Sequence, residues 1–467
     1  MSIPYGSRTG SVRLAFYGDD FTGSTDALEV LAFAGLRCAL FLKPPTPAML
    51  QRFGHLDAIG LAGDSRGMTP QEMDVALPAL LEALAKLAPI VHYKVCSTFD
   101  SSPAIGNIGR VIDIARRCVS GGMVPIVAGN PALGRYCLFG NLFARSGTDG
   151  KVYRIDRHPI MSVHPVTPMD EADLGVHLAR QASLAIAKFT IADLDKGRDA
   201  IDQTLAALAL ERAEGVLFDA ATPAHLTDIG RLLDVEAHRR NPLFVVGSSG
   251  VEYALTQWWE EAKLPTRGTS GFNSFPGVDR VLAVSGSAST LTAMQIEAAV
   301  AAGFAELPVN ARHLVDDAHW PAARNEIVGL AVAQLSQGRS VILHTARGPL
   351  DPRIGEMVDA LMGQGLSKAQ AKHEGGRTLG LRLGQIARDI LARVPLRRLL
   401  LSGGDTSSQV TQVLAPDALT IAARLAPGAP LCRMHADAAE LDGLEVALKG
   451  GQMGSVNFFD DARRGNA

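Results

Sequence analysis

The stretch Leu399-Leu400-Leu401-Ser402-Gly403-Gly404-Asp405-Thr406 indicates the fold of this chain. An apolar run meets two glycines, an aspartate and hydroxyl residues, and helical apolar spacing follows at Val410 and Val413-Leu414. This pattern predicts a strand, a tight turn and a helix. Glycine lets the backbone approach a ligand closely, and a helix N-terminus presents free N–H groups to an anion. The turn is therefore a candidate phosphate site, although it lacks the lysine of a P-loop and ordinary helix capping would use the same residue types.

A second glycine cluster favours the phosphate interpretation over simple capping. It reads Leu448-Lys449-Gly450-Gly451-Gln452-Met453-Gly454 and follows another apolar run. A third turn of small residues, Gly286-Ser287-Ala288-Ser289, follows the apolar run Val281 to Val284. Glycine-rich loops of this kind in one half of a chain predict a phosphate-rich ligand.

The N-terminal half contains a turn of the same kind that is rich in acids. The strand-like run that ends at Tyr17 leads into Gly18-Asp19-Asp20-Phe21-Thr22-Gly23, and helical spacing follows from Ala27. In open α/β sheets, ligands bind beyond the carboxyl ends of the strands, which is where this turn would lie. The adjacent carboxylates could accept hydrogen bonds from a polyol, bind a divalent cation or act as a base; the plainer alternative is a helix cap and a solvated acid.

Basic residues follow or end other predicted strands of this half. Arg66 follows the strand predicted at Ala58 to Ala62, Lys94 lies within an otherwise apolar strand from Ile90, and Arg135 ends a loop after Met123 to Ala128. Arg66 would suit a bidentate clamp on a carboxylate, although a surface arginine is equally compatible with the pattern. A lysine within an apolar strand is expected at a sheet edge or directed toward an anion, because burying it unpaired is costly.

The alternation of strand, loop and helix predicts an α/β fold with two domains, each with a mainly parallel sheet flanked by helices and with the active site in the cleft between them. A Gly-, Pro-, Ser- and Thr-rich stretch at 264–277 is the predicted linker, so the domains are expected at 1–265 and 278–467. Residues 136–170 interrupt the alternation of strands and helices and are expected to form a long loop or small excursion. Strands resume at Phe189 to Ile191. His158 and His164 lie in this excursion without a third metal ligand at an obvious spacing. The sequence therefore does not identify residues that bind a metal.

Composition bounds the class of protein. The chain has 467 residues, a formal net charge of −3 and 47% hydrophobic residues, which fits two globular domains. No basic run interleaves with aromatic residues, so nucleic acid is not an expected partner. Five scattered cysteines argue against a disulfide framework and a thiolate metal site. With no apolar leader or membrane span, a cytoplasmic location is expected and no membrane partner.

Five motifs, in order along nearly the whole chain, resemble those of the four-carbon acid sugar kinase family. They are Asp19-Asp20-Phe21-Thr22-Gly23, Tyr93-Lys94-Val95-Cys96-Ser97-Thr98, Gly286-Ser287-Ala288-Ser289, Gly403-Gly404-Asp405-Thr406 and Lys449-Gly450-Gly451-Gln452-Met453-Gly454. The resemblance implies an N-terminal acid-sugar-binding domain and a C-terminal ATP-binding domain that transfers the γ-phosphate to a terminal hydroxyl in carbohydrate catabolism. Family substrates are threonate, erythronate, 3-oxo-tetronates and 3-oxo-isoapionate.

The resemblance also implies roles for particular residues. ATP, with Mg²⁺ bridging its phosphates, would be held by Ser287, Gly403, Gly404, Asp405, Thr406 and Gly450. The acid sugar would be held by Asp19, Asp20, Arg66, Lys94, Ser97, Thr98 and Asn107. Asp19, Asp20 and Asp405 are the candidate catalytic groups, and the residues do not choose among them. Whether the chain forms a homodimer stays open.

Two departures from the family pattern lie in the sugar-binding half. Cys96 stands where the family has an aspartate, and an altered loop from Phe99 to Ile105 precedes Gly106-Asn107 in place of the usual arginine. Both point to a branched or otherwise modified acid sugar as an alternative to a tetronate. A sensor that binds nucleotide or sugar acid without catalysis, or another α/β enzyme of phosphorylated sugars, are the alternatives to a kinase; the first strand lacks the Gly-x-Gly-x-x-Gly of a dinucleotide site.

Overall fold

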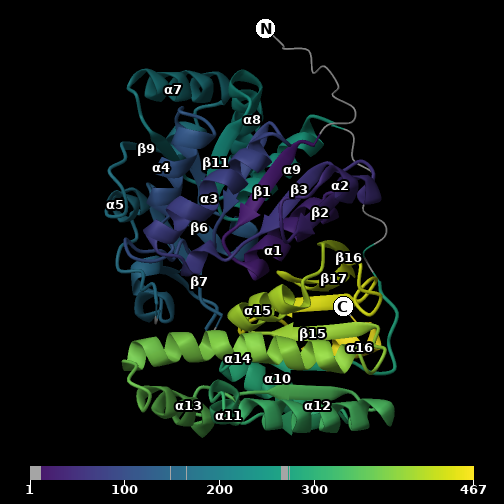
Figure 1. The fold of residues 1–467 in the computed structure, drawn as a ribbon. Helices are drawn as coiled ribbons and strands as arrows, with labels where there is room; N and C mark the ends of the chain where they lie inside the picture. Colours follow the sequence, from purple (N-terminus) through teal and green to yellow (C-terminus); the bar gives the residue numbers. More distant parts are fainter. Residues whose placement is uncertain (1–11, 148, 165, 265–271, 273, 467) are drawn as a thin grey trace. The chain divides into compact units, whose positions relative to one another are not determined.

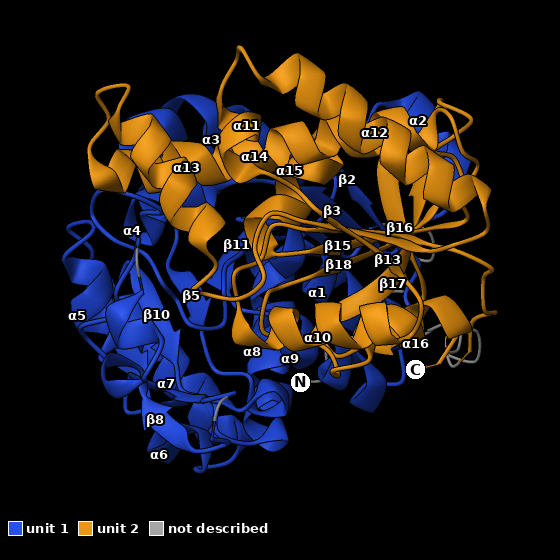
Figure 2. Cartoon of the chain, turned by 90° about the horizontal axis from the view of Figure 1, so that it is seen from below, with its two compact units in different colours: residues 1–268 blue, residues 269–467 orange. Residues whose placement is uncertain are grey.

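The computed structural model describes residues 12–147, 149–164, 166–264, 272 and 274–466. The chain forms two compact units, Met1–Gly268 and Thr269–Ala467, which Figure 2 colours separately. The predicted linker at 264–277 lies largely outside the described residues. Among the helices of the described ranges, none is both long and apolar enough to cross a membrane.

Unit 1 is built on a parallel sheet with the strand order β2-β3-β1-β4-β11-β5-β10-β9. Its strands are β1 (Leu14–Gly18), β2 (Cys38–Phe41), β3 (Ala58–Ala62), β4 (Ile90–Lys94), β5 (Val124–Val127), β9 (Ile186–Phe189), β10 (Gly215–Phe218) and β11 (Leu243–Gly247). Every residue of β1, β3 and β4 is buried. Strands that are covered on both faces read as continuous apolar runs, which is why the sequence pattern located them.

Helices connect these strands, as parallel pairing requires. They are α1 (Phe21–Phe33), α2 (Pro47–Phe53), α3 (Pro70–Ala85), α4 (Ile108–Cys118), α5 (Leu174–Ala179), α6 (Ile191–Leu194), α7 (Arg198–Leu210), α8 (Pro223–Arg240) and α9 (Gly250–Glu261). The predicted excursion forms a separate antiparallel sheet of β6 (Arg135–Leu138), β7 (Asn141–Arg145) and β8 (Val152–Arg154). Figure 1 shows β1, β2 and β3 of the main sheet side by side in purple.

Unit 2 carries a mixed sheet with the strand order β13-β14-β12-β15-β18-β17-β16. Its strands are β12 (Leu282–Ser285), β13 (Ala305–Pro308), β14 (Val341–His344), β15 (Arg398–Ser402), β16 (Ala418–Ala426), β17 (Ala429–His435) and β18 (Glu445–Lys449). The first five in the order are parallel, whereas β17 is antiparallel to both β18 and β16. The prediction of an α/β fold with mainly parallel sheets is therefore confirmed.

The helices of unit 2 are α10 (Thr290–Ala301), α11 (Ala311–Val315), α12 (Trp320–Ser336), α13 (Pro352–Met362), α14 (Lys368–Leu391), α15 (Gly404–Leu414) and α16 (Phe458–Arg464). The long helix α14 packs against α15, and it also contacts α11, α12 and α13 (Figure 1). Two glycines permit the close approach to α15, because a Cβ at Gly380 would lie 1.6 Å from the Gln409 side chain and one at Gly384 2.8 Å from Val413. This packing fixes α15, whose first residues belong to the candidate phosphate site.

Candidate active site

Three neighbouring strands of unit 1 end at the same level and deliver the predicted acidic and basic residues to one edge. Gly18 at the end of β1 is level with Ala62 of β3 and Lys94 of β4. The backbone joins the loops that follow: Asp19 N donates to Lys94 O at 2.9 Å, and Arg66 N donates to Asp19 O at 3.1 Å. The edge therefore gathers Asp19, Asp20 and Arg66 from separate parts of the chain.

The guanidinium of Arg66 binds both aspartates. It donates to the two carboxylate oxygens of Asp19, at 2.7 and 3.1 Å, and to Oδ2 of Asp20 at 2.8 Å. Asp20 also caps helix α1, since its Oδ1 accepts from Gly23 N at 2.7 Å. Three N–H groups of Arg66 thus donate to carboxylates of the chain itself. The sequence had predicted a sugar carboxylate as the partner of this arginine.

The environment perturbs the protonation of Asp19. Burial raises the pKa of Asp19 to about 6, the charge of Arg66 opposes this rise, and the neighbouring Asp20 adds to it. A carboxyl with a pKa near the working pH can take up a proton during the reaction, which is the property of a general base. The side chain of Asp20 is the more accessible of the two, at 17% exposed against 6% for Asp19.

Lys94 lies beneath this edge. The residue is 1% exposed, its Nζ donates to Val95 O at 3.0 Å, and it lies 3.4 Å from Oδ2 of Asp26. Although burial alone would lower it, the pKa of Lys94 is raised because Asp26 and other acids stabilise the ammonium. Gly23 makes the close approach possible, since a Cβ there would lie 2.5 Å from Asp20 Oδ1 and 3.3 Å from Lys94 Nζ. In this structure Lys94 therefore pairs with Asp26 of helix α1, the helix that begins in the acidic turn.

The turn after β4 holds the other predicted substrate residues. Cys96 Sγ lies 3.0 Å from Thr98 Oγ1, which donates to the buried carboxylate of Asp100. Burial raises the pKa of Cys96 to about 11, so the thiol stays neutral near pH 7. Ser97 is half-buried in the same turn. Phe99 has a φ of 54°, a left-handed conformation that is strained for an aromatic residue and is often associated with functional sites.

Asn107 has a structural place. Its side-chain oxygen accepts from Arg110 N and caps helix α4, while its amide nitrogen donates to Pro103 O and Gln181 O, both at 3.2 Å. The residue is 3% exposed. These bonds use the polar atoms of Asn107 within the chain, so its assignment to the sugar remains a prediction from the family pattern.

Sequence reasoning left two polar groups of this region unassigned. Asp100 accepts from Thr98 and lies 3.5 Å from Thr167 Oγ1, and burial, which would raise its pKa, is outweighed by Arg66 and Thr98, so that the pKa is lowered. Arg135, at the start of β6, donates only to backbone carbonyls through Nη1, while its Nε is buried without a partner.

In the described part of the chain, no carboxylate pairs with Arg135. Burial lowers the pKa of its guanidinium, and Cys96 is close enough to act on it electrostatically. The sequence signal for Arg135 was its position in a loop at the sheet edge; Asp100 gave none, because one acid in an irregular loop resembles any other.

The predicted nucleotide residues come together in unit 2. Strands β12, β15 and β18 are adjacent, and their ends are tied by Gly286 N donating to Ser402 O at 3.1 Å and Gly403 N donating to Lys449 O at 2.9 Å. Gly403 has a φ of 110° and precedes helix α15 directly. A Cβ on Gly286 would lie 2.1 Å from Thr406 Oγ1. The glycines therefore allow three loops to close around the N-terminus of one helix.

Hydroxyl groups connect the loop after β12 to the loop after β18. Thr292 Oγ1 lies 3.0 Å from Ser287 Oγ and 3.1 Å from Gly451 O. Lys449 Nζ donates to Thr292 Oγ1 at 3.3 Å and to Gly450 O at 3.2 Å. Burial lowers the pKa of Lys449 to about 7, and no carboxylate of the described residues pairs with it.

Asp405 differs from its neighbours because it is exposed in the first turn of α15. Mg²⁺ that accompanies a nucleotide keeps several waters and needs only one or two protein carboxylates. Asp405 is the carboxylate that this loop offers for that purpose. Within the described ranges, no three His, Cys, Asp or Glu side chains gather as a metal ion held by the protein alone would require.

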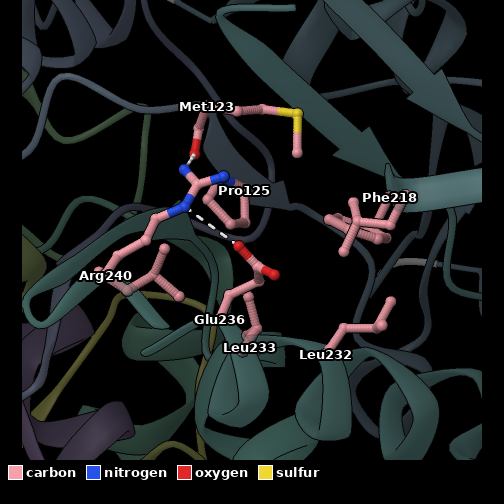
Figure 3. A pocket seen from close by; sticks show the side chains of 9 residues that line it. Met123, Pro125, Phe218, Leu232, Leu233, Glu236 and Arg240 are labelled. Carbon is pink, nitrogen blue, oxygen red and sulfur yellow. Dashed lines mark hydrogen bonds and ion pairs between the residues drawn. The ribbon is translucent and has the colours of Figure 1, made fainter. Parts of the chain in front are cut away.

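A cavity between β5, β10 and helix α8 is not part of either site. Its volume is about 10 Å³, which is room for one water molecule at most. Figure 3 shows apolar side chains around it and Arg240, which donates to Met123 O at 2.9 Å and pairs with Glu236 at 3.1 Å. The bond to Met123 O anchors helix α8 beside the sheet, and the pair with Glu236 lies within the helix.

Comparison with known proteins agrees with this division of the chain. Residues 14–255 match the model of a sugar-binding N-terminal domain, and residues 282–459 match that of a nucleotide-binding C-terminal domain. The chain is 44% identical to a 3-oxo-isoapionate kinase of Paraburkholderia graminis, over 97% of this chain and 94% of that protein. It is 30% identical to a 3-oxo-tetronate kinase of Cupriavidus necator, over 97% and 96%.

The crystal structure of a protein from Salmonella typhimurium LT2 has the same fold. Its TM-score is 0.75 at 25% identity, over 97% of this chain and 99% of that one. The two family models and the kinase relatives show a kinase in which a sugar-binding unit precedes a nucleotide-binding unit. The chain belongs to the four-carbon acid sugar kinase family, as its motifs predicted.

Proposed function

We propose that the protein transfers the γ-phosphate of ATP to a terminal hydroxyl of 3-oxo-isoapionate or a closely related branched acid sugar, as a step in carbohydrate catabolism. The observation that carries this proposal is the 44% identity to a 3-oxo-isoapionate kinase along nearly the whole chain. Cys96 and the altered loop from Phe99 to Ile105 depart from the family's usual pattern, and these departures support a substrate other than a simple tetronate.

The acid sugar would bind at the carboxyl edge of the unit 1 sheet, in a domain of residues 1–265. Arg135 is the better candidate than Arg66 for the sugar carboxylate, because Arg66 already binds Asp19 and Asp20 while Arg135 has a buried Nε with no partner. Charged hydrogen bonds between arginine and carboxylate are strong and directional. Ser97 and Thr98 would then contact the hydroxyl groups.

The nucleotide would bind in a domain of residues 278–467. Backbone N–H groups at the start of α15 and the glycine loops after β12 and β18 suit the phosphates, since a helix N-terminus and closely approaching glycines favour anions. Ser287, Gly403, Gly404, Thr406 and Gly450 are the contacts in this proposal. Asp405 would hold Mg²⁺, which would neutralise part of the phosphate charge.

Asp19 and Asp20 would orient the sugar hydroxyl that attacks the γ-phosphate. Asp19 is the better base of the two because its pKa of about 6 allows it to take the hydroxyl proton and return it to solvent. The carboxylate of Asp20 would accept a hydrogen bond from that hydroxyl, since it is the more accessible of the two. Phosphoryl transfer depends mainly on positioning and charge neutralisation, so these groups need supply little covalent chemistry.

The decisive test is ADP release by the purified chain with Mg-ATP across 3-oxo-isoapionate, the 3-oxo-tetronates, threonate and erythronate. We expect the highest kcat/KM with 3-oxo-isoapionate. A preference for an unbranched tetronate would refute the assigned substrate while retaining the kinase. Binding of ATP without turnover for any member of the panel would refute the acid sugar as the acceptor.

A further inference from the structure

A buried pair of titratable side chains lies in unit 1, beside Lys94 and away from the contacts of Arg66. His92 of β4 and Glu252 of α9 are both fully buried, and Nδ1 of His92 lies 2.6 Å from Oε1 of Glu252. Nε2 of His92 lies 3.1 Å from Gly247 O at the end of β11. Burying ionisable groups costs free energy, so the pair calls for a physical explanation.

The two hydrogen bonds of His92 fix the protons of its ring. A backbone carbonyl can only accept, so Nε2 must carry a proton in order to bond to Gly247 O. A proton must also lie between Nδ1 and Oε1 of Glu252, because two lone pairs would repel each other at 2.6 Å. The pair is therefore either an imidazolium with a carboxylate or a neutral imidazole with a carboxylic acid.

The position of Glu252 favours the ionised form of the pair. Glu252 lies in the first turn of α9, where the unpaired N–H groups and the helix dipole stabilise a carboxylate. Its other oxygen, Oε2, is buried and has no hydrogen-bond partner among the described residues. A buried carboxylate oxygen without a hydrogen bond needs a positive charge nearby to offset its loss of water.

The ammonium of Lys94 supplies that charge. His92 and Lys94 occupy alternate positions of β4, so their side chains leave the same face of the sheet. Burial lowers the pKa of Lys94, but acids around it outweigh burial and raise the pKa. These acids come from α1, α9, the turn after β1 and the turn after β4, and they are Asp26, Glu252, Asp19 and Cys96.

Lys94 acts in turn on the acidic turn that begins α1. Burial raises the pKa of Asp19, and the positive charges of Arg66 and Lys94 oppose this rise. The backbone joins the same two segments, since Asp19 N donates to Lys94 O at 2.9 Å. Charges of alternating sign thus lead from the buried pair through Lys94 to the acids of the turn and of helix α1.

We propose that His92 and Glu252 are positioning residues: as an imidazolium and a carboxylate, they hold the ammonium of Lys94 against the turn that carries Asp19 and Asp20. Only the consequence for catalysis rests on the proposed function, in which these two acids act on the sugar hydroxyl. The ionised pair itself is a property of folded unit 1, so it can be tested without any substrate.

The nitrogen-15 NMR spectrum of the wild-type histidines tests the ionised pair without a substitution in the core. An imidazolium carries protons on both ring nitrogens, whereas a neutral imidazole leaves one nitrogen bare. At pH 8 an exposed histidine is mostly neutral, and we expect His92 to show two protonated nitrogens. The signals of His92 are identified by their loss in His92→Gln. A bare ring nitrogen on His92 would overturn the proposal.

Glu252→Gln tests the link to Lys94. Glutamine keeps the shape of the side chain and can donate to a neutral His92, but it carries no charge. With carbon-13 at the lysine ε-carbons, the Lys94 signal is identified by its loss in Lys94→Met. We expect Lys94 to lose its proton at lower pH in Glu252→Gln than in wild type, because one acid that stabilises the ammonium is gone.

The matched control is Glu260→Gln, which removes an exposed carboxylate from the same helix. It should leave the titration of Lys94 as in wild type. A Lys94 titration in Glu252→Gln that equals this control would overturn the proposal, since a neutral pair would lose no charge on substitution.

The pH profile of kcat/KM for the acid sugar extends the test to the reaction. If the ammonium supports the turn, the alkaline limb should move to lower pH in Glu252→Gln but not in Glu260→Gln. In the Lys94→Met background, Glu252→Gln should cause no further change, because its effect passes through Lys94. A further loss there would overturn the positioning role. If no acid sugar is turned over, the proposed function fails, and the two NMR titrations still decide whether the ionised pair exists.

Discussion

Arg66 donates to both carboxylate oxygens of Asp19, at 2.7 and 3.1 Å, and to Asp20 at 2.8 Å. Two acids at the end of one strand are therefore held by one arginine from the end of the next. The two adjacent carboxylates repel each other, and the guanidinium between them offsets that repulsion. It also makes the pKa of Asp19 dependent on Arg66, which gives the catalytic assignment a measurable consequence.

Replacing Asp20 by Asn tests its role at the reacting hydroxyl. Asn keeps the oxygen that caps helix α1, whereas Ala would remove the cap at a cost of about 0.5–2 kcal/mol. We expect kcat to fall by about a hundredfold or more and the affinity for ADP to stay constant. Asp173→Asn, at the cap of α5, is the control and should retain kcat. Full activity in Asp20→Asn would remove Asp20 from the mechanism.

The pH profile tests Asp19. If Asp19 is the base, kcat/KM for the acid sugar at saturating Mg-ATP should fall on the acidic side with an apparent pKa of about 6. In Arg66→Met the positive charge that lowers the pKa of Asp19 is lost, so the acidic limb should move to higher pH. The pKa of the ATP phosphates does not depend on Arg66, so their titration would not move with this substitution. An unshifted limb would therefore mean that a group other than Asp19 is titrating.

Arg135→Met tests the proposed carboxylate contact. A hydrogen bond to a charged group contributes about 1.5–3 kcal/mol, so KM for the acid sugar should rise by about tenfold to a hundredfold. KM for ATP should not change. Arg145→Met removes the same charge from an exposed position of β7 and should leave both constants unaltered. If Arg135→Met behaves like this control, the carboxylate binds elsewhere.

Gly403→Ala tests the phosphate turn. The φ of 110° at this residue is strained for any residue with a Cβ, and the added carbon would lie 3.1 Å from Thr406 Oγ1 and 3.3 Å from Ser287 N. We expect a loss of at least about tenfold in ADP affinity, because strain of about 1–3 kcal/mol would distort the loop. Gly376→Ala, in helix α14 with open space around it, is the control. Equal ADP affinity in the two variants would contradict the assignment.

The sequence pattern located most strands of the main sheets, but it misplaced one strand and missed one hairpin. Ala58–Ala62 was predicted with its exact bounds because a strand buried on both faces is a continuous apolar run. The strand predicted at Phe189 to Ile191 instead ends at Phe189, since Thr190 and Asp193 form a capping box that begins α6. The β16–β17 hairpin was missed, although Pro427-Gly428 between two apolar runs was a usable signal.

The site was predictable as an edge but not as a set of contacts. Parallel strands bring their carboxyl ends together, so the position of Asp19 and Arg66 followed from the strand pattern. Side-chain direction did not follow from it. Arg66 and Lys94 were both predicted to meet a sugar carboxylate, which stays a prediction; the sequence did not reveal that Arg66 pairs with Asp19 and Lys94 with Asp26 within the chain. Such pairing depends on backbone bonds between loops that no local pattern encodes.

Lys449 gives a prediction about stability. Burial lowers its pKa from 10.5 to about 7, so the folded chain binds this proton less tightly than the unfolded chain. Below pH 7 the ammonium is charged in both states and the cost of burying it is fully present; between pH 7 and 10.5 that cost is relieved. Lys449→Met should therefore unfold at higher urea concentration than wild type at pH 6, with the difference shrinking toward pH 10. Lys372→Met, exposed on α14, should show no such trend.

Lys449 also gives a prediction about nucleotide binding, because a phosphate at the Gly450 loop would stabilise the ammonium and raise its pKa. At pH 8 the free protein holds Lys449 mostly neutral, so binding of ADP should take up protons. Calorimetry in buffers of different ionisation enthalpy measures that uptake, which should disappear in Lys449→Met and persist in Lys372→Met. Uptake that is equal in both variants would place the titrating group elsewhere. Loss of uptake in Lys449→Met alone would place the phosphates beside Gly450.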